Sequence, residues 1–207
     1  MNSAPPSKPK KSIWRTILDF VVILAIAVGV AVLVQAFFVR SFEVTSSSMY
    51  PTIKPGDRLI ADRYTFYFRK PHLGDIVVFR YPPDGPNSLN TKNLWYWPFE
   101  QIGEILHLTH RLDSPPFVKR VIATEGQTVQ VKNGTVYVNG KALKEPYKVP
   151  DSSNFGPVTV PEGTLFCMGD NRPNSRDSRY IGFIPIRSVI GRAVFRFWPF
   201  SRFGAPR

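Results

Sequence analysis

The sequence predicts a mainly β fold, in which a single N-terminal transmembrane helix is followed by an exported antiparallel β-sheet domain. Three observations favour it. An apolar run over residues 20–39 is long enough to cross a bilayer, 20 of the 207 residues are proline, and Asn-Gly pairs interrupt valine-rich segments. Proline at about twice its usual share of roughly 5% favours turns and strand edges over a helical bundle. Because 43% of the residues are hydrophobic, the chain can form a real core. This argues against a protein that is as a whole a disordered basic tail, such as a chromatin linker.

The first predicted element is the membrane helix. Its apolar run has Gln35 as its single strongly polar residue, and at about 1.5 Å per residue it spans roughly 30 Å. A cleavable leader has an apolar stretch of about 7 to 15 residues with small residues behind it, whereas Phe37 and Phe38 follow here. No polar face recurs along the run, which argues against a buried core helix. We therefore predict an uncleaved anchor over residues 17–39.

The net charge of +12 gathers at the two ends of the chain. Residues 1–16 hold four basic groups and residues 187–207 hold five, and neither segment contains an acid. Because positive residues flank the cytoplasmic side of a membrane helix, we expect a basic cytoplasmic tail over 1–16 and an exported domain over 40–207. Export separates most of the chain from nucleic acid, so we expect a lipid bilayer and no nucleic acid as partner.

The C-terminal arginines alternate with aromatic residues, and two interpretations stay open for this stretch. It could contact anionic lipid headgroups, or it could form packed strand ends, which we favour for Phe195 and Phe197. No metal or cofactor is expected, because one cysteine, Cys167, and three histidines give no zinc pattern. His107 and His110 have a ligand-like spacing, but no third ligand accompanies them.

Strand signals continue through the exported domain. The segments 76–79 and 118–123 are apolar and follow turn-like residues, and two further apolar segments, 165–168 and 183–185, bracket a polar loop. Residues 82–116 form a turn-rich insertion of unknown role.

A hairpin is predicted around Asn133-Gly134. A two-residue type I′ turn there pairs Val131 with Val136 and Val129 with Val138, so that the four valines share one face. Asn139-Gly140 repeats the signal and extends the hairpin into a meander. Asn133-Gly-Thr also matches a glycosylation acceptor, but the strand register explains the pair without a modification.

A serine cluster, Ser46 to Ser48, lies a few residues beyond the anchor. Such clusters are usually solvated turns or caps, yet one close to the bilayer could meet membrane-embedded substrates. A nucleophilic serine needs a base, and the histidines lie in turn-rich stretches without an orienting carboxylate. A lysine made neutral by burial is the alternative. Lys119 has apolar strand neighbours on both sides of its Lys-Arg pair, although a water-facing lysine on an edge strand fits that context too.

The third unusual stretch is the loop 169–182, which contains two Asp, two Asn, two Ser and three Arg. Loops this polar are normally solvated. Because apolar strands bracket it, the loop could instead form a hydrogen-bonded network that orients a base.

Four motifs follow the anchor in order: Ser-Ser-Met-x-Pro-Thr, Gly-Asp-Ile-Val-Val-Phe, Val-Lys-Arg-Val-Ile, and Gly-Asp-Asn-Arg-x-Asn-Ser-x-Asp-Ser-Arg-x-x-Gly. Together they resemble the bacterial type I signal peptidases, or leader peptidases, which are Ser/Lys endopeptidases that remove signal peptides from exported preproteins. The resemblance covers roughly residues 13–204. It departs at Ser47, where many relatives have glycine, and at 123–127, where the family usually has Gly-x-Pro-Gly-Asp.

The resemblance implies roles for particular residues. Ser48 would be the nucleophile, Lys119 the general base and Ser175 the group that holds the lysine amine in line. The Ser48 N–H and the Ser46 hydroxyl would form the oxyanion hole. Shallow apolar pockets for small substrate side chains would be lined by Phe42, Val44, Ile53, Leu59, Phe117 and Val118. A charged network would support the site through Arg120, Asp170, Asp177 and Arg179.

The resemblance also implies partners and a location. Signal peptides of preproteins would be the substrates, and the protein-export translocon could lie nearby. The catalytic domain would lie on the outer face of a plasma or thylakoid membrane, whether periplasmic, extracellular or lumenal. An anchored scaffold without activity would not need the serine, the lysine and the polar loop together. A self-cleaving Ser/Lys repressor would need a helix-turn-helix motif where this chain has its anchor.

Overall fold

The computed structural model describes residues 13–37, 39–62, 65–80 and 116–206, and the chain divides into two compact units, 1–37 and 38–207. Most of the predicted basic tail, nearly all of the predicted insertion, His107 and His110 lie outside the described residues. The elements of the second unit are β1 (Val39–Glu43), β2 (Arg58–Asp62), α2 (Thr65–Phe68), β3 (Ile76–Phe79), β4 (Phe117–Thr124), β5 (Thr128–Lys132), β6 (Thr135–Val138), β7 (Lys141–Ala142), β8 (Phe155–Thr159), β9 (Thr164–Met168), η2 (Arg172–Asn174), α4 (Ser178–Ile181), β10 (Ile184–Pro185), η3 (Ile186–Ser188), β11 (Val189–Trp198) and η4 (Phe200–Arg202).

The first unit is one helix, α1 (Ile13–Phe37). Its 25 residues correspond to about 37 Å at the usual helical rise. Residues 13–30 are apolar enough to cross a membrane and their side chains are exposed. The helix begins four residues before the start of the predicted anchor. It ends two residues before the anchor's predicted end, because Val39 already pairs with Asp62 in a sheet.

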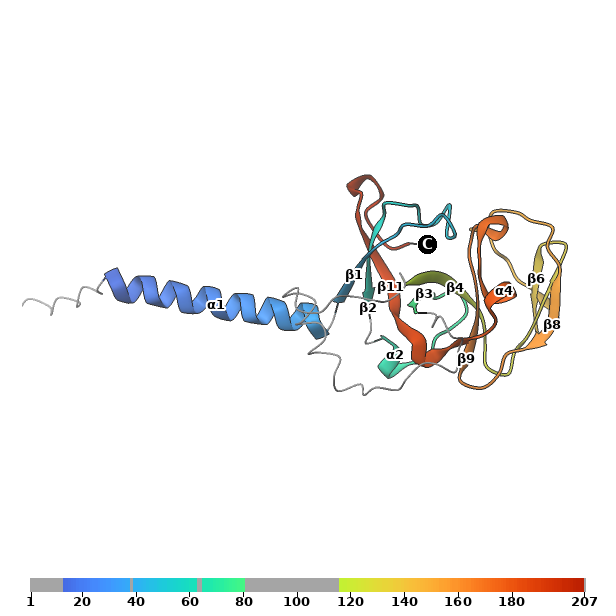
Figure 1. The fold of residues 1–207 in the computed structure, drawn as a ribbon, viewed down its shortest axis with the longest axis horizontal. Helices are drawn as coiled ribbons and strands as arrows, with labels where there is room; N and C mark the ends of the chain where they lie inside the picture. Colours follow the sequence, from blue (N-terminus) through green and yellow to red (C-terminus); the bar gives the residue numbers. More distant parts are fainter. Residues whose placement is uncertain (1–12, 38, 63–64, 81–115, 207) are drawn as a thin grey trace, which may run out of the picture. The chain divides into compact units, whose positions relative to one another are not determined.

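The second unit is built on antiparallel sheets, so the predicted mainly β fold is confirmed (Figure 1). A seven-stranded sheet has the order β1-β2-β11-β3-β4-β9-β10. The C-terminal strand β11 lies between β2 and β3 and so joins the two halves of this sheet. Neighbouring strands in the sheet are therefore often distant in sequence.

A smaller sheet has the order β7-β6-β5-β8. Its β5–β6 hairpin pairs Val129 with Val138 and Val131 with Val136, which confirms the predicted register. Asn133 and Gly134 both have positive φ, as do Asn139 and Gly140, and a type I′ turn requires this at both central residues. The two Asn-Gly pairs therefore fold as the predicted meander.

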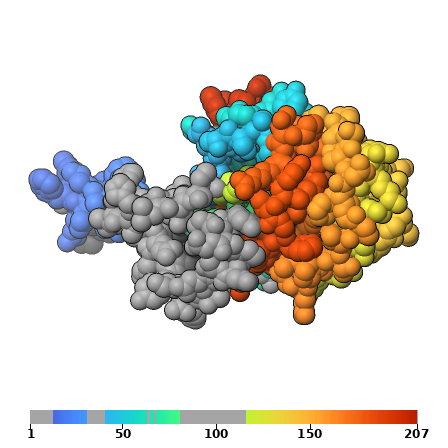
Figure 2. Space-filling model, turned by 45° about the vertical axis from the view of Figure 1, so that its right-hand side comes forward, coloured from blue at the N-terminus to red at the C-terminus, as the bar shows by residue number. Residues whose placement is uncertain are grey.

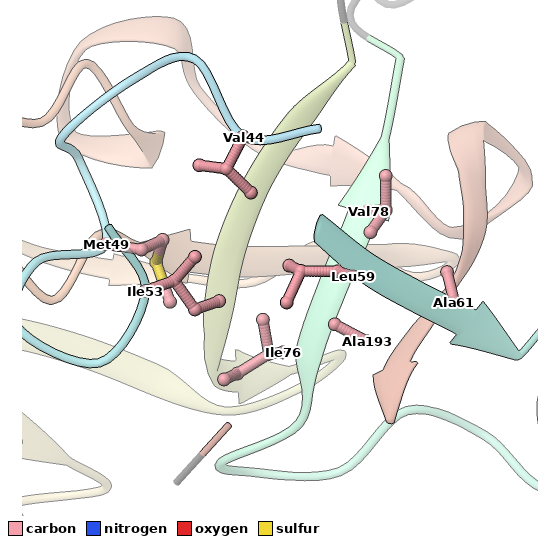
Figure 3. Packing of buried hydrophobic residues seen from close by; sticks show 8 residues of the cluster. All are labelled: Val44, Met49, Ile53, Leu59, Ala61, Ile76, Val78 and Ala193. Atoms are coloured by element: carbon pink, nitrogen blue, oxygen red, sulfur yellow. The ribbon is translucent and has the colours of Figure 1, made fainter. Parts of the chain in front are cut away.

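Three apolar clusters form the core. One lies under the seven-stranded sheet near its β2 edge and includes Met49, Ile53 and Leu59, whose side chains converge in Figure 3. A second joins the two sheets, because valines of β5 and β6 pack with Phe166 and Met168 of β9. The third gathers residues of β3, β4 and β9. The two sheets thus share one core.

The aromatic residues near the C-terminus are less buried than we expected. Phe195 and Phe197 are half-buried, so these two strand residues are packed but are not fully buried core residues. Phe195 packs edge-on against Phe203 with ring centres 4.7 Å apart. Trp198 and Phe200 are exposed, and Trp198, the last residue of β11, pairs with Arg58 at the end of β2.

Candidate active site

Ser48 lies in a tight turn between β1 and β2. The Tyr50 amide donates to the Ser47 carbonyl at 3.0 Å, and the Ile53 amide donates to the Met49 carbonyl at 2.8 Å. Met49 and Ile53 anchor the turn because their side chains are buried in the core. Ser48 itself is only 7% exposed, so its hydroxyl sits in a fixed, largely dry environment.

Lys119 reaches this hydroxyl from β4. Its backbone pairs with Val77 of β3 in the interior of the sheet, and the residue is 3% exposed. The Lys119 Nζ lies 2.7 Å from the Ser48 Oγ and 3.0 Å from the Val118 carbonyl oxygen. The alternative of a water-facing lysine on an edge strand is therefore wrong.

Burial changes the acidity of this lysine. Removal from water lowers the pKa of Lys119 from 10.5 to about 8, although the charges of Asp177 and Asp170 raise it in part. A much larger fraction of the amine is therefore neutral near pH 8 than for a lysine in water. A neutral amine has a lone pair that can accept the Ser48 proton.

Two donors lie beside the Ser48 hydroxyl. The Ser46 Oγ is 3.3 Å from the Ser48 Oγ. In the part of the chain that the structure describes, the Ser48 backbone N–H has no hydrogen-bond acceptor. Both groups are thus available to a negatively charged oxygen near Ser48.

Ser175 is buried beside Ser48, but its hydroxyl has no hydrogen-bond partner among the described residues. The expected contact with the Lys119 amine is thus absent from this arrangement. Both serines pack against Gly169, where only a residue without a side chain fits. A Cβ on Gly169 would lie 2.2 Å from the Ser175 Oγ and 2.4 Å from the Ser48 carbonyl oxygen.

The backbone of Gly169 is held from both sides. Its N–H donates to Asp177 at 3.0 Å, and its carbonyl accepts from Arg172 Nε at 3.0 Å. Arg172 also forms a buried ion pair with Glu145. The neighbouring Asn171 backbone amide donates a hydrogen bond to the Ser48 carbonyl at 3.0 Å, so the polar loop contacts the serine turn directly.

The predicted charged residues form two buried ion pairs. Asp170 accepts from Arg120 at 2.9 and 2.7 Å and from the Thr52 hydroxyl at 2.6 Å. The Arg120 guanidinium also stacks on Tyr147, 3.8 Å from the ring centre. Asp177 accepts from Arg179 at 2.9 and 3.0 Å.

The six predicted substrate-lining residues fall into two groups. Val44, Ile53 and Leu59 are buried in the core, whereas Phe42, Phe117 and Val118 are half-buried. Phe42 and Val118 pack on the cluster that the buried three belong to. Because that cluster is filled, the half-buried residues can offer a shallow apolar surface and no deep pocket.

Sequence reasoning missed several residues that hold the site together. Thr52, Gly169 and Asn171 stand inside the recognised motifs, so their positions could have suggested a role. Glu145 and Tyr147 lie outside any motif, and only the folded chain brings them to Arg172 and Arg120.

The chain matches known proteins over most of its length. The family model described as signal peptidase, peptidase S26, matches residues 17–198. A probable signal peptidase I-1 from Synechocystis sp. is 39% identical over 199 residues, which cover 96% of this chain and 91% of that protein.

Two further matches are more partial. Thylakoidal processing peptidase 1 from Arabidopsis thaliana is 36% identical over 85% of this chain and 47% of its own length. The crystal structure of a signal peptidase I from Enterococcus faecalis shares 29% identity and covers 60% of this chain and 97% of its own, with a TM-score of 0.42. The assignment rests on the sequence matches: the chain belongs to the peptidase S26 family of signal peptidases, which are serine proteases.

Proposed function

We propose that this chain is a membrane-anchored serine endopeptidase that cleaves signal peptides from preproteins after small residues, with Ser48 as nucleophile and Lys119 as general base. The observation that carries the proposal is the 2.7 Å contact between the Lys119 Nζ and the Ser48 Oγ, in a lysine whose pKa is lowered to about 8. Family membership supports the reaction, and this contact supports the dyad.

The reaction follows from these groups in two halves. Ser48 Oγ attacks the scissile carbonyl carbon while its proton passes to the Lys119 Nζ. The oxyanion accepts hydrogen bonds from the Ser48 N–H and the Ser46 hydroxyl. The protonated lysine then gives its proton to the leaving amine, and a water deprotonated by the same lysine hydrolyses the acyl-enzyme.

Selection of small residues follows from the shallow apolar surface. Phe42, Phe117 and Val118 lie on a filled core, so a large side chain next to the scissile carbonyl finds no room below them. The supporting residues Arg120, Asp170, Asp177 and Arg179 act through the backbone of the polar loop and touch no reacting atom. We propose Ser175 as a further member of this support.

The proposed location is a single-pass arrangement with the N-terminus in the cytoplasm and residues 40–207 on the outer face of a plasma or thylakoid membrane. The apolar helix and the four basic residues before it support this orientation. Proximity to the export translocon follows from where preproteins emerge.

The test is cleavage of a model preprotein by the full chain in detergent. Ser48→Ala and Lys119→Ala should each reduce kcat/KM by about 10⁴-fold, while Lys132→Ala, which alters an exposed lysine of the other sheet, should leave it unchanged. Mass spectrometry of the product should show a cut after a small residue. Retained activity in folded Lys119→Ala protein would rule out the dyad.

A further inference from the structure

A hollow lies on the polar loop at Ser175, which packs near the Ser48 backbone. It is an open pocket of about 510 Å³ lined by Pro173, Asn174, Ser175, Arg176 and Tyr180. All five residues come from the polar loop, from η2 to α4. This volume is within the range of ligand pockets and exceeds that of a single side chain. The pocket can therefore receive a short stretch of peptide.

Ser175 links this pocket to Ser48. The Ser175 Oγ and the Ser48 carbonyl oxygen both lie within 2.4 Å of the position that a Gly169 Cβ would occupy. The Asn171 amide, one residue before η2, donates directly to the same carbonyl. In Figure 2 the orange surface of residues near 170–180 adjoins the light-blue surface of residues near 50. The pocket wall at Ser175 therefore lies next to the backbone of Ser48.

The three arginines of the loop differ in their partners. Arg172 pairs with Glu145, and Arg179 pairs with Asp177 and Asp151, so both charges are neutralised within the fold. Arg176 is exposed and, within the described part of the chain, forms no hydrogen bond or ion pair. None of the lining residues that the structure describes is acidic. The pocket therefore offers one uncompensated guanidinium, a group whose planar geometry suits a carboxylate.

The position of the pocket decides which part of a substrate reaches it. The apolar surface proposed for the residues before the scissile bond comes from β1 and β4, and no residue of it lines the pocket. An extended peptide that occupies this surface and places its carbonyl at Ser48 must leave by another side. The pocket at Ser175 is an open hollow next to the Ser48 backbone on the polar-loop side.

We propose that this pocket binds the first residues after the scissile bond, and that Arg176 selects an acidic side chain among them. The proposal rests on the proposed function. It adds that the enzyme also recognises the charge of the first residues after the scissile bond in its substrate. Arg176 acts on binding and takes no part in the proton transfers.

The test uses matched preproteins that differ at one position, with Glu, Gln or Lys placed at the first, second or third residue after the cut. Wild-type protein in detergent should cleave the best Glu substrate about tenfold faster, by kcat/KM, than its Lys counterpart at low salt, and salt should reduce the ratio. Arg176→Ala should bring the two rates within twofold of each other. Arg176→Glu should reverse the order.

Lys141→Glu is the matched control, because it makes the same charge change at an exposed residue of the other sheet. It should keep the wild-type preference. An unchanged preference in Arg176→Ala, or a charge effect confined to residues before the cut, would overturn the inference while cleavage itself persists. Failure of the wild-type protein to cut any of these substrates would overturn the proposed function and this inference together.

Discussion

The two sheets of the second unit bury different kinds of residue. The four-stranded sheet buries valines of β5 and β6 and no charged group. The seven-stranded sheet buries Lys119 and Arg120 side by side on one strand, with Asp170 and Asp177 in the adjoining loop. Burying charge costs several kcal/mol per ion unless partners compensate. The larger sheet therefore carries a stability cost where the chemistry lies, and the smaller sheet stabilises the fold without one.

The largest expected effect is on the stability of the larger sheet. Asp170→Ala leaves the Arg120 guanidinium buried without its carboxylate and removes the acceptor of Thr52. We expect a loss of about 3–5 kcal/mol in unfolding free energy, measured by denaturant titration. Glu43→Ala breaks an exposed pair with Arg58 and should cost less than about 1 kcal/mol. Equal losses in the two variants would show that the buried pair has no special weight.

Substitution of two glycines, one in each region, should distinguish an effect on activity from an effect on stability. Gly169→Ala forces the Ser175 Oγ and the Ser48 carbonyl apart, and we expect kcat to fall about 100-fold, since small displacements at a reacting group have such effects. Gly134→Ala in the smaller sheet clashes with the Asp151 carbonyl at a residue of positive φ, so it should lower Tm with kcat retained in the folded fraction. The comparison fails if Gly134→Ala lowers kcat as much as Gly169→Ala.

The smaller sheet should respond to loss of apolar volume alone. Val131 is 2% exposed and packs in the cluster between the sheets. Val131→Ala should reduce unfolding free energy by about 2 kcal/mol, from lost burial and the cavity left behind. Steady-state cleavage below the unfolding transition should keep its wild-type kcat. A fall in kcat without a fall in Tm would mean that this sheet shapes the site.

Per unit of change, the smallest expected effect comes from pH. In the proposed mechanism cleavage needs the neutral form of Lys119, whose pKa is lowered to about 8, so protonation below that pH would remove the base. We expect kcat/KM to rise about tenfold per pH unit up to roughly pH 8 and then to level off. Thermal unfolding followed over the same range separates this limb from acid damage. A flat profile between pH 6 and 8 would contradict a titrating lysine base.

Local sequence signals predicted the β5–β6–β7 meander of the smaller sheet but not its fourth strand, β8. Two Asn-Gly pairs and alternating valines determine its register over short distances, so the β5–β6 pairing could be predicted directly. The larger sheet joins β11 to β2 and β3 across more than a hundred residues, and no period reveals that pairing.

The site was predictable only in part. The motifs pointed to Ser48 and Lys119 through resemblance, whereas the burial of Lys119 depends on long-range strand pairing. Glu145 and Tyr147 could not be predicted, because a loop outside the motifs brings them to the site. Ser175, whose hydroxyl has no partner among the described residues, packs closely against Gly169, and this contact depends on tertiary packing.

The adjacency of Lys119 and Arg120 on β4 affects how the concentration of active protein should be measured. Neighbours on a strand face opposite sides, so a one-residue slip against β3 would exchange them. The guanidinium that then faced Ser48 has hydrogen-bond donors and no acceptor, so it could not serve as base. A misregistered molecule would keep its β content and its mass yet contribute no turnover. The concentration of active protein should therefore be measured by covalent labelling of Ser48, the proposed nucleophile, and not by absorbance.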